Sequence, residues 1–89
     1  MARFMISYDL HSPTNNRDSV EKAIESLGAY CKYLTTTYLV KTSYSISNVQ
    51  DICTKPLDSN DKMMICEITG TVHGWLSQEN WNWINTNMS

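Results

Sequence analysis

The sequence lacks an excess of basic charge, and its few basic residues are spread along the chain. Seven lysines and arginines stand against nine acidic residues, which leaves a net charge of −2 at pH 7. A dedicated nucleic-acid-binding domain usually carries a basic patch. The composition therefore argues against tight nucleic-acid binding unless folding or dimerisation gathers the basic side chains. They are Arg3, Arg17, Lys22, Lys32, Lys41, Lys55 and Lys62.

Long apolar runs are also absent. No segment approaches the roughly 20 consecutive apolar residues that a membrane-spanning helix needs. The apolar stretch at the N-terminus is interrupted by Arg3 and Ser7 and leads into Asp9, which is not typical of a signal peptide. We therefore expect a protein that has no membrane partner.

Cysteine pairs at metal-binding or redox spacing are missing as well. Cys31, Cys53 and Cys66 lie far apart, and no C-x-x-C motif indicates a zinc site or a redox pair. Each cysteine lies among apolar residues, which favours buried, reduced thiols. Because reduced thiols persist in the cytosol, we expect a cytoplasmic protein.

The length of the chain, 89 residues, is that of one domain. We assign the core to residues 1–70 and a C-terminal tail to residues 71–89. A chain this short buries only about 60–65% of its unfolded surface. Charged residues make up only 18% of the sequence, so part of the surface is apolar or neutral. A homodimer interface would cover such a surface.

The first segment predicts a central strand. Residues 2–8 alternate with Phe4, Ile6 and Tyr8 on one face and Met5 and Ser7 on the other. Apolar side chains on both faces indicate a central strand that helices cover on one side.

A helix is expected next. Asp18 precedes Glu21 by three residues, which is the spacing of a capping box at a helix start, and Gly28 suits the position after its last turn. The apolar stripe of this helix consists of Val20, Ala23, Ile24 and Leu27.

Two β-rich segments follow, with a turn near Thr35-Thr36. Ser45 or Ser47 then caps a second helix, which Pro56 ends. A further strand is predicted over residues 62–69 because apolar residues occupy both of its faces.

The C-terminal tail predicts a short helix that begins after Ser77. Its Trp81, Ile84 and Met88 have helical spacing and would pack on the sheet. In an alternative interpretation, Trp75, Trp81 and Trp83 form a stacking platform for bases, although core or subunit packing is the commoner role for tryptophan.

This order of elements predicts an α+β fold of the ferredoxin-like split βαβ type (βαββαβ), followed by a C-terminal helix. Its antiparallel four-stranded sheet would carry helices on one face. The other face would be bare in a monomer unless a second copy or the tail covers it.

The first strand ends in Tyr8-Asp9, and with this order the chain resembles the CRISPR-associated protein 2 family. It also resembles the related VapD-type toxin ribonucleases and small SinR-like proteins, and its tail is closer to the SinR-like group. The resemblance reaches to Gly70. It rests on the segments Met5–Leu10, Ser26–Gly28, Thr37–Val40 and Ser59–Ile65.

The resemblance implies that Asp9 is a ligand for Mg²⁺ or Mn²⁺ and meets its symmetry mate across a dimer. Two carboxylates, with waters and a substrate phosphate, would complete an octahedral site. Ser7 or Tyr8 would then position the phosphate, Arg17 would bind substrate, and His11 would act as a general acid or base.

Several alternatives stay open. Asp9 could instead cap a nearby turn or helix, and only Arg17 and Lys22 supply positive charge around the first helix, beside Glu21 and Glu25. We therefore expect a homodimer with weak or no nuclease activity in a defence, toxin–antitoxin or phage–host setting. The alternatives are a metal-dependent endonuclease acting on RNA or DNA and a non-catalytic adaptor that binds a protein or a small molecule.

Overall fold

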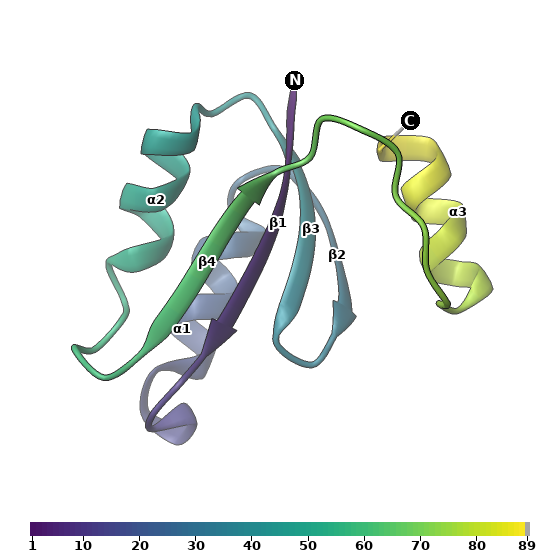
Figure 1. The fold of residues 1–89 in the computed structure, drawn as a ribbon. Helices are drawn as coiled ribbons and strands as arrows, with labels where there is room; N and C mark the ends of the chain where they lie inside the picture. The colour runs from purple at the N-terminus through teal and green to yellow at the C-terminus, as the bar shows by residue number, and fades with distance from the viewer. Residues whose placement is uncertain (89) are drawn as a thin grey trace.

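The computed structural model describes residues 1–88, apart from the side chains of residues 13–15. In chain order its elements are β1 (Ala2–Asp9), α1 (Pro13–Glu25), β2 (Ala29–Leu34), β3 (Thr37–Thr42), α2 (Ile46–Thr54), β4 (Lys62–Glu67) and α3 (Gln78–Asn87). The four strands form one antiparallel sheet in the order β2-β3-β1-β4 (Figure 1). The predicted α+β fold is confirmed, and its order is consistent with a ferredoxin-like arrangement.

One face of the sheet packs against α1 and α2, and we call it the helix face. The alternation predicted for β1 places Phe4, Ile6 and Tyr8 there, where all three are buried. Val20 and Ile24 of α1 are fully buried against them. Burying each large apolar side chain contributes about 1.5–3 kcal/mol before entropy is counted, so this layer is the main core. Its members from α2 are Val49 and Cys53.

The opposite face, which we call the tail face, is partly covered by the segment that follows β4 and by α3 (Figure 1). Leu39 of β3 is buried there against Ile84 and Met88. The Arg3 guanidinium donates a hydrogen bond to the Met88 carbonyl oxygen and fastens the end of α3 to β1. The prediction that the C-terminal helix packs on the sheet is confirmed, whereas Trp75 is 99% exposed.

Local sequence signals correctly predicted the turn between β2 and β3 and the starts of α2 and α3. The chain turns at Thr35-Thr36 between β2 and β3, as predicted. Ser45 caps α2 by accepting a hydrogen bond from the backbone of Asn48, and Ser77 caps α3 in the same way. Each cap satisfies one of the backbone N–H groups that a helix start leaves unpaired.

The predicted start of the first helix was wrong. α1 begins at Pro13 after Ser12, so Asp18 lies inside the helix and forms no capping box with Glu21. Proline suits the first helical turn because its φ is already helical and it has no N–H to satisfy. The predicted strand over 62–69 is also shorter, since β4 ends at Glu67.

None of the helices found in residues 1–88 has both the length and the apolar character required to cross a bilayer.

Candidate functional site

The Asp9 carboxylate lies at the end of β1 on the tail face. Asp9 lines an open hollow of about 290 Å³. Asp9 is exposed and opposite Lys62 in the β1–β4 register, as Ser7 is opposite Met64. No residue whose side chain is described forms a hydrogen bond or ion pair with this carboxylate. The lining residues are Ser7, Tyr8, Asp9, Lys62, Met63 and Met64.

Ser7 has a partner of its own. Its hydroxyl lies 3.1 Å from the Thr37 hydroxyl on the adjacent strand β3. Thr37 is buried, and the pair joins the neighbouring strands β1 and β3 at the end of their register. Ser7 therefore shares a face with Asp9, as the predicted alternation requires.

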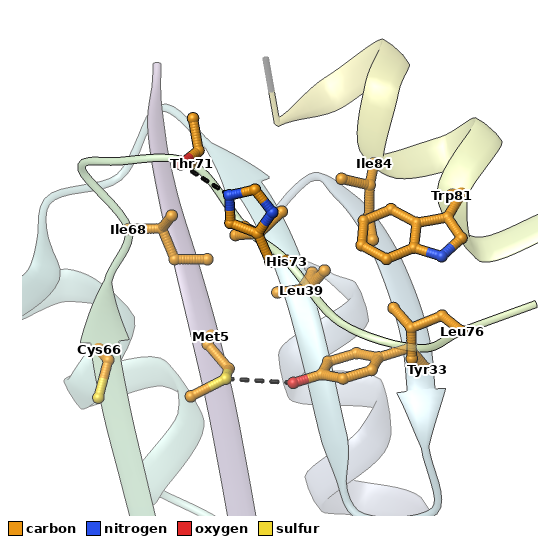
Figure 2. Close-up of a pocket in the computed structure, with 11 residues that line it drawn as sticks. Met5, Tyr33, Leu39, Cys66, Ile68, Thr71, His73, Leu76, Trp81 and Ile84 are labelled. Carbon is orange, nitrogen blue, oxygen red and sulfur yellow. Dashed lines mark hydrogen bonds between the residues drawn. The ribbon is translucent and has the colours of Figure 1, made fainter.

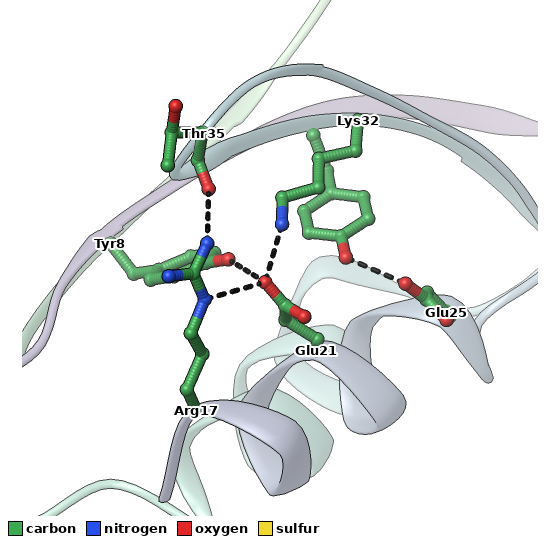
Figure 3. Close-up of polar contacts among 7 residues, drawn as sticks. Tyr8, Arg17, Glu21, Glu25, Lys32 and Thr35 are labelled. Carbon is green, nitrogen blue, oxygen red and sulfur yellow. Dashed lines mark hydrogen bonds and ion pairs between the residues drawn. The ribbon is translucent and has the colours of Figure 1, made fainter. Parts of the chain in front are cut away.

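The Tyr8 hydroxyl lies on the other face of the sheet, inside a polar cluster with α1 (Figure 3). It donates to Glu21 Oε2 at 3.0 Å, and Arg17 Nε approaches the same oxygen at 3.1 Å. Lys32 Nζ from β2 lies 2.6 Å from it. Arg17 also donates to the Thr35 carbonyl oxygen at 3.4 Å. Three donors thus converge on one carboxylate oxygen.

The electrostatics of this cluster favour a charged glutamate and neutral phenols. The hydrogen bond from Lys32 is the largest cause that lowers the pKa of Glu21, and burial opposes it. Burial, and then the bond to Glu21, raise the pKa of Tyr8 well above its usual range. Tyr38 donates to Glu25 at 2.6 Å, and burial raises its pKa in the same direction. These phenols stay protonated at neutral pH and act as hydrogen-bond donors to α1.

His11 lies in the loop after β1, and its side chain is exposed. Its backbone N–H donates to Asp61 Oδ1 at 2.7 Å, and the Asn16 amide donates to Oδ2 of the same residue at 2.7 Å. The Asp58 N–H supplies a third bond at 2.8 Å. These bonds, led by that from Asp58, lower the pKa of Asp61. Asp61 thereby joins the loop that follows β1 to the loop that precedes β4.

The donor set of one protomer does not fit a divalent metal ion. Among the residues that the structure describes, no three histidine, cysteine or acidic side chains come together at one place. Mg²⁺ requires several oxygen ligands, Asp9 supplies one carboxylate, and the nearby Asp61 already accepts three hydrogen bonds. The metal site implied by the resemblance therefore needs the Asp9 of a second copy.

The structure brings together only part of the predicted site. Ser7 and Asp9 share the hollow, whereas the Tyr8 hydroxyl and the Arg17 guanidinium belong to the cluster on the helix face. The His11 side chain has no described partner in the hollow. Sequence reasoning missed Lys62, although the pairing of the first and last strands of a split βαβ would have placed it near Asp9.

A second cavity, of about 340 Å³, lies between the tail and the sheet (Figure 2). Its floor consists of the sheet residues Met5, Tyr33, Leu39 and Cys66, together with Ile68, which follows β4 directly. Its remaining walls come from the tail and α3, namely Thr71, Val72, His73, Leu76, Trp81 and Ile84. His73 had no predicted role, because nothing in its sequence neighbourhood shows that the tail folds back over the sheet.

The comparison with protein-family models finds no match, and neither does the comparison with curated proteins. The resemblance to the CRISPR-associated protein 2 and VapD-type proteins therefore stays a prediction.

Proposed function

We propose that this chain is a homodimeric assembly protein with the fold of the CRISPR-associated protein 2 and VapD superfamily. It has weak or no nuclease activity and binds a protein partner in a defence, toxin–antitoxin or phage–host setting. One observation carries this proposal: the sheet separates the Asp9 carboxylate from the Tyr8 hydroxyl and the Arg17 guanidinium.

Phosphodiester cleavage requires positive charge and hydrogen-bond donors around the phosphate, next to the metal ligands. Here Arg17 and Lys32 both pair with Glu21 on the helix face, away from Asp9. A phosphate near Asp9 finds one basic neighbour in the hollow, Lys62. This arrangement supports a binding surface better than a catalytic centre.

The tail face around the hollow supports the homodimer. Met64, which is 67% exposed, lines the hollow and lies outside the cluster covered by α3. Asp9 and Lys62 provide opposite charges on neighbouring strands of the same face. A two-fold axis near the hollow would set Asp9 of each copy opposite Lys62 of the other, which makes the surface self-complementary.

The second candidate function is a metal-dependent endonuclease that uses Asp9 from both protomers. It is favoured by the exposure of Asp9 and by the absence of a hydrogen-bond partner for it among the described side chains. Mg²⁺ or Mn²⁺ bound between the two carboxylates would polarise a phosphate, and the Ser7 hydroxyl and the Lys62 ammonium, which line the same hollow, would orient it.

Two measurements on the same samples test the proposal. Light scattering after gel filtration gives the mass of the wild type, Asp9→Asn and Asp51→Asn. Cleavage of labelled single- and double-stranded RNA and DNA is then followed with Mg²⁺, with Mn²⁺ and with a chelator. Asp51→Asn is the matched control, because Asp51 is an exposed carboxylate on α2.

A dimer without cleavage, followed by capture of a protein partner from the native host, is the expected result. A monomeric wild type would overturn the proposal. Metal-dependent cleavage that Asp9→Asn abolishes and Asp51→Asn retains would replace it with the nuclease function.

A further inference from the structure

The cavity between the tail and the sheet takes no part in the proposed function. It is open on one side and lined by three separate parts of the chain, the sheet, the segment after β4 and α3 (Figure 2). Its volume of about 340 Å³ lies within the range of small-molecule sites, roughly 300–1,000 Å³.

The uncharged, partly aromatic lining of the cavity favours a neutral and flat ligand. No aspartate, glutamate, lysine or arginine contributes to it, so an ion would lose its hydration without gaining a charged partner. The rings of Tyr33 and Trp81 offer aromatic surface on one side, with Leu39 and Ile84 beside them (Figure 2). An apolar cavity of about 150 Å³ holds benzene, so this larger cavity matches two fused rings.

Two polar groups in the cavity have weak partners. The Tyr33 hydroxyl donates to Met5 Sδ at 3.1 Å, and a thioether is a weak acceptor. Burial raises the pKa of Tyr33, so its hydroxyl keeps the proton that it donates. His73 Nε2 lies 3.4 Å from the Thr71 hydroxyl, which is long for a hydrogen bond. A ligand carbonyl or ring nitrogen would be a better acceptor for Tyr33 than the sulfur is.

We infer that this cavity binds a neutral two-ring heteroaromatic compound that carries a hydrogen-bond acceptor. The Tyr33 hydroxyl donates to that acceptor, and the rings lie against Trp81. His73, at the mouth of the cavity, supplies a second polar contact.

The test uses 4-quinolone, a neutral two-ring compound with a carbonyl acceptor, titrated into ¹⁵N-labelled protein. The three tryptophans give separate indole N–H signals. The Trp81 signal should shift saturably while that of Trp75, which is 99% exposed, stays in place. Benzoate, a one-ring anion, should not bind. Tyr33→Phe keeps the ring and should weaken 4-quinolone binding about two- to tenfold, the effect of one hydrogen bond.

Filling the cavity provides the second arm of the test. Cys66→Leu adds bulk inside it, and Met64→Leu is the matched control on the same face of β4 but outside it. Folding of each variant is verified from the dispersion of its amide signals. Binding lost in Cys66→Leu and kept in Met64→Leu supports the inference. No saturable shift in the wild type, or a shift that survives Cys66→Leu, overturns it.

Discussion

The Tyr8 hydroxyl donates a hydrogen bond to Oε2 of Glu21 at 3.0 Å. This bond ties the central strand β1 to α1 and directs the tyrosine of the Tyr8-Asp9 pair away from the aspartate. The same oxygen also accepts hydrogen bonds from Arg17 and Lys32. The phenol is therefore a structural donor on the helix face, and the chemistry near Asp9 has to proceed without it.

Tyr8→Phe should lower the free energy of unfolding by about 0.5–1.5 kcal/mol, the usual net effect of one hydrogen bond. Urea unfolding measures it. Tyr30→Phe is the control, because Tyr30 is 44% exposed and its hydroxyl has no hydrogen-bond partner among the described residues. A Tyr8→Phe variant of unchanged stability that loses an activity of the wild type would show that the hydroxyl acts on a substrate instead.

The charge of Glu21 should make stability depend on pH. Folding lowers the pKa of Glu21 below its ordinary value of 4.5, mainly through the hydrogen bond from Lys32. The native state then binds fewer protons than the unfolded state, so the stabilisation is present above about pH 4.5 and is lost as the pH falls through the folded pKa. Glu21→Gln carries no charge to titrate.

Urea midpoints of the wild type and Glu21→Gln between pH 7 and pH 3 give the measurement. The wild type should be the more stable of the two at pH 7, and the difference should shrink below about pH 4.5. Asp61 also has a lowered pKa, but it titrates in both proteins and cancels in the comparison. A difference that stays constant over the whole range would rule out the ion pairs of Glu21 as its cause.

Much of the fold could be predicted because its signals are local. The apolar stripe of α1, the turn at Thr35-Thr36 and the cap at Ser77 each depend on residues a few positions apart. The start of α1 has one local signal, Pro13 at the first helical position, and further contacts with distant segments that the sequence does not reveal. The Asn16 amide in its second turn bonds to Asp61 and to the Pro56 carbonyl oxygen, and these partners lie 40 or more positions away.

In the candidate site, too, some features follow from local sequence patterns and others from contacts between distant segments. Strand alternation already placed Tyr8 and Ser7 on opposite faces, and it should have separated Tyr8 from the site of Asp9. Arg17 and Glu21 are four positions apart in α1, so their pairing is local. The bonds of Glu21 to Tyr8 and Lys32 depend instead on where α1 packs on the sheet, which no local pattern specifies. The cavity with Tyr33 and His73 depends on where the tail crosses the sheet, and no periodic pattern encodes that crossing.

Gly28 marks a place where the backbone leaves no room for a side chain. Its φ is 157°, and a Cβ there would overlap the carbonyl oxygen of Lys41 on β3. Gly28→Ala should therefore destabilise the protein by at least about 1 kcal/mol. Gly70→Ala is the control, because its Cβ would meet no atom within 4 Å. Thermal unfolding measures the stability of both variants. An equal loss of stability in the two would mean that the β3 backbone moves to make room for the added Cβ without destabilising the protein.

Asp61→Ala should loosen the loop after β1. The Asp61 carboxylate accepts hydrogen bonds from the His11 N–H, the Asn16 amide and the Asp58 N–H. Removing the carboxylate frees the amides of His11 and Asp58, which should exchange with solvent several-fold faster in hydrogen-exchange measurements. The amide of Val40 in the central strand β3 should be unchanged and serves as the control. Unaltered exchange at His11 would mean that another acceptor replaces Asp61.

The charges of Asp9 and Lys62 distinguish the two ways in which a dimer could form on the tail face. If Asp9 of each copy faces Lys62 of the other, Lys62→Glu removes two exposed ion pairs. Because each is worth about 0.2–1 kcal/mol, the loss of both should raise the dissociation constant about two- to thirtyfold. The double variant Asp9→Lys/Lys62→Asp should restore the dimer. Lys55→Glu, which makes the same charge change at another exposed site, is the control.

Sedimentation measurements across a dilution series provide the dissociation constants, and Asp9→Asn gives the decisive contrast. In the ion-paired dimer, removing the Asp9 charge weakens association. In a dimer whose two Asp9 carboxylates face each other, as a metal site requires, the same change relieves repulsion between like charges and strengthens association without metal. Stronger association of Asp9→Asn, together with an unaffected Lys62→Glu, would therefore contradict the self-complementary surface and favour the nuclease function.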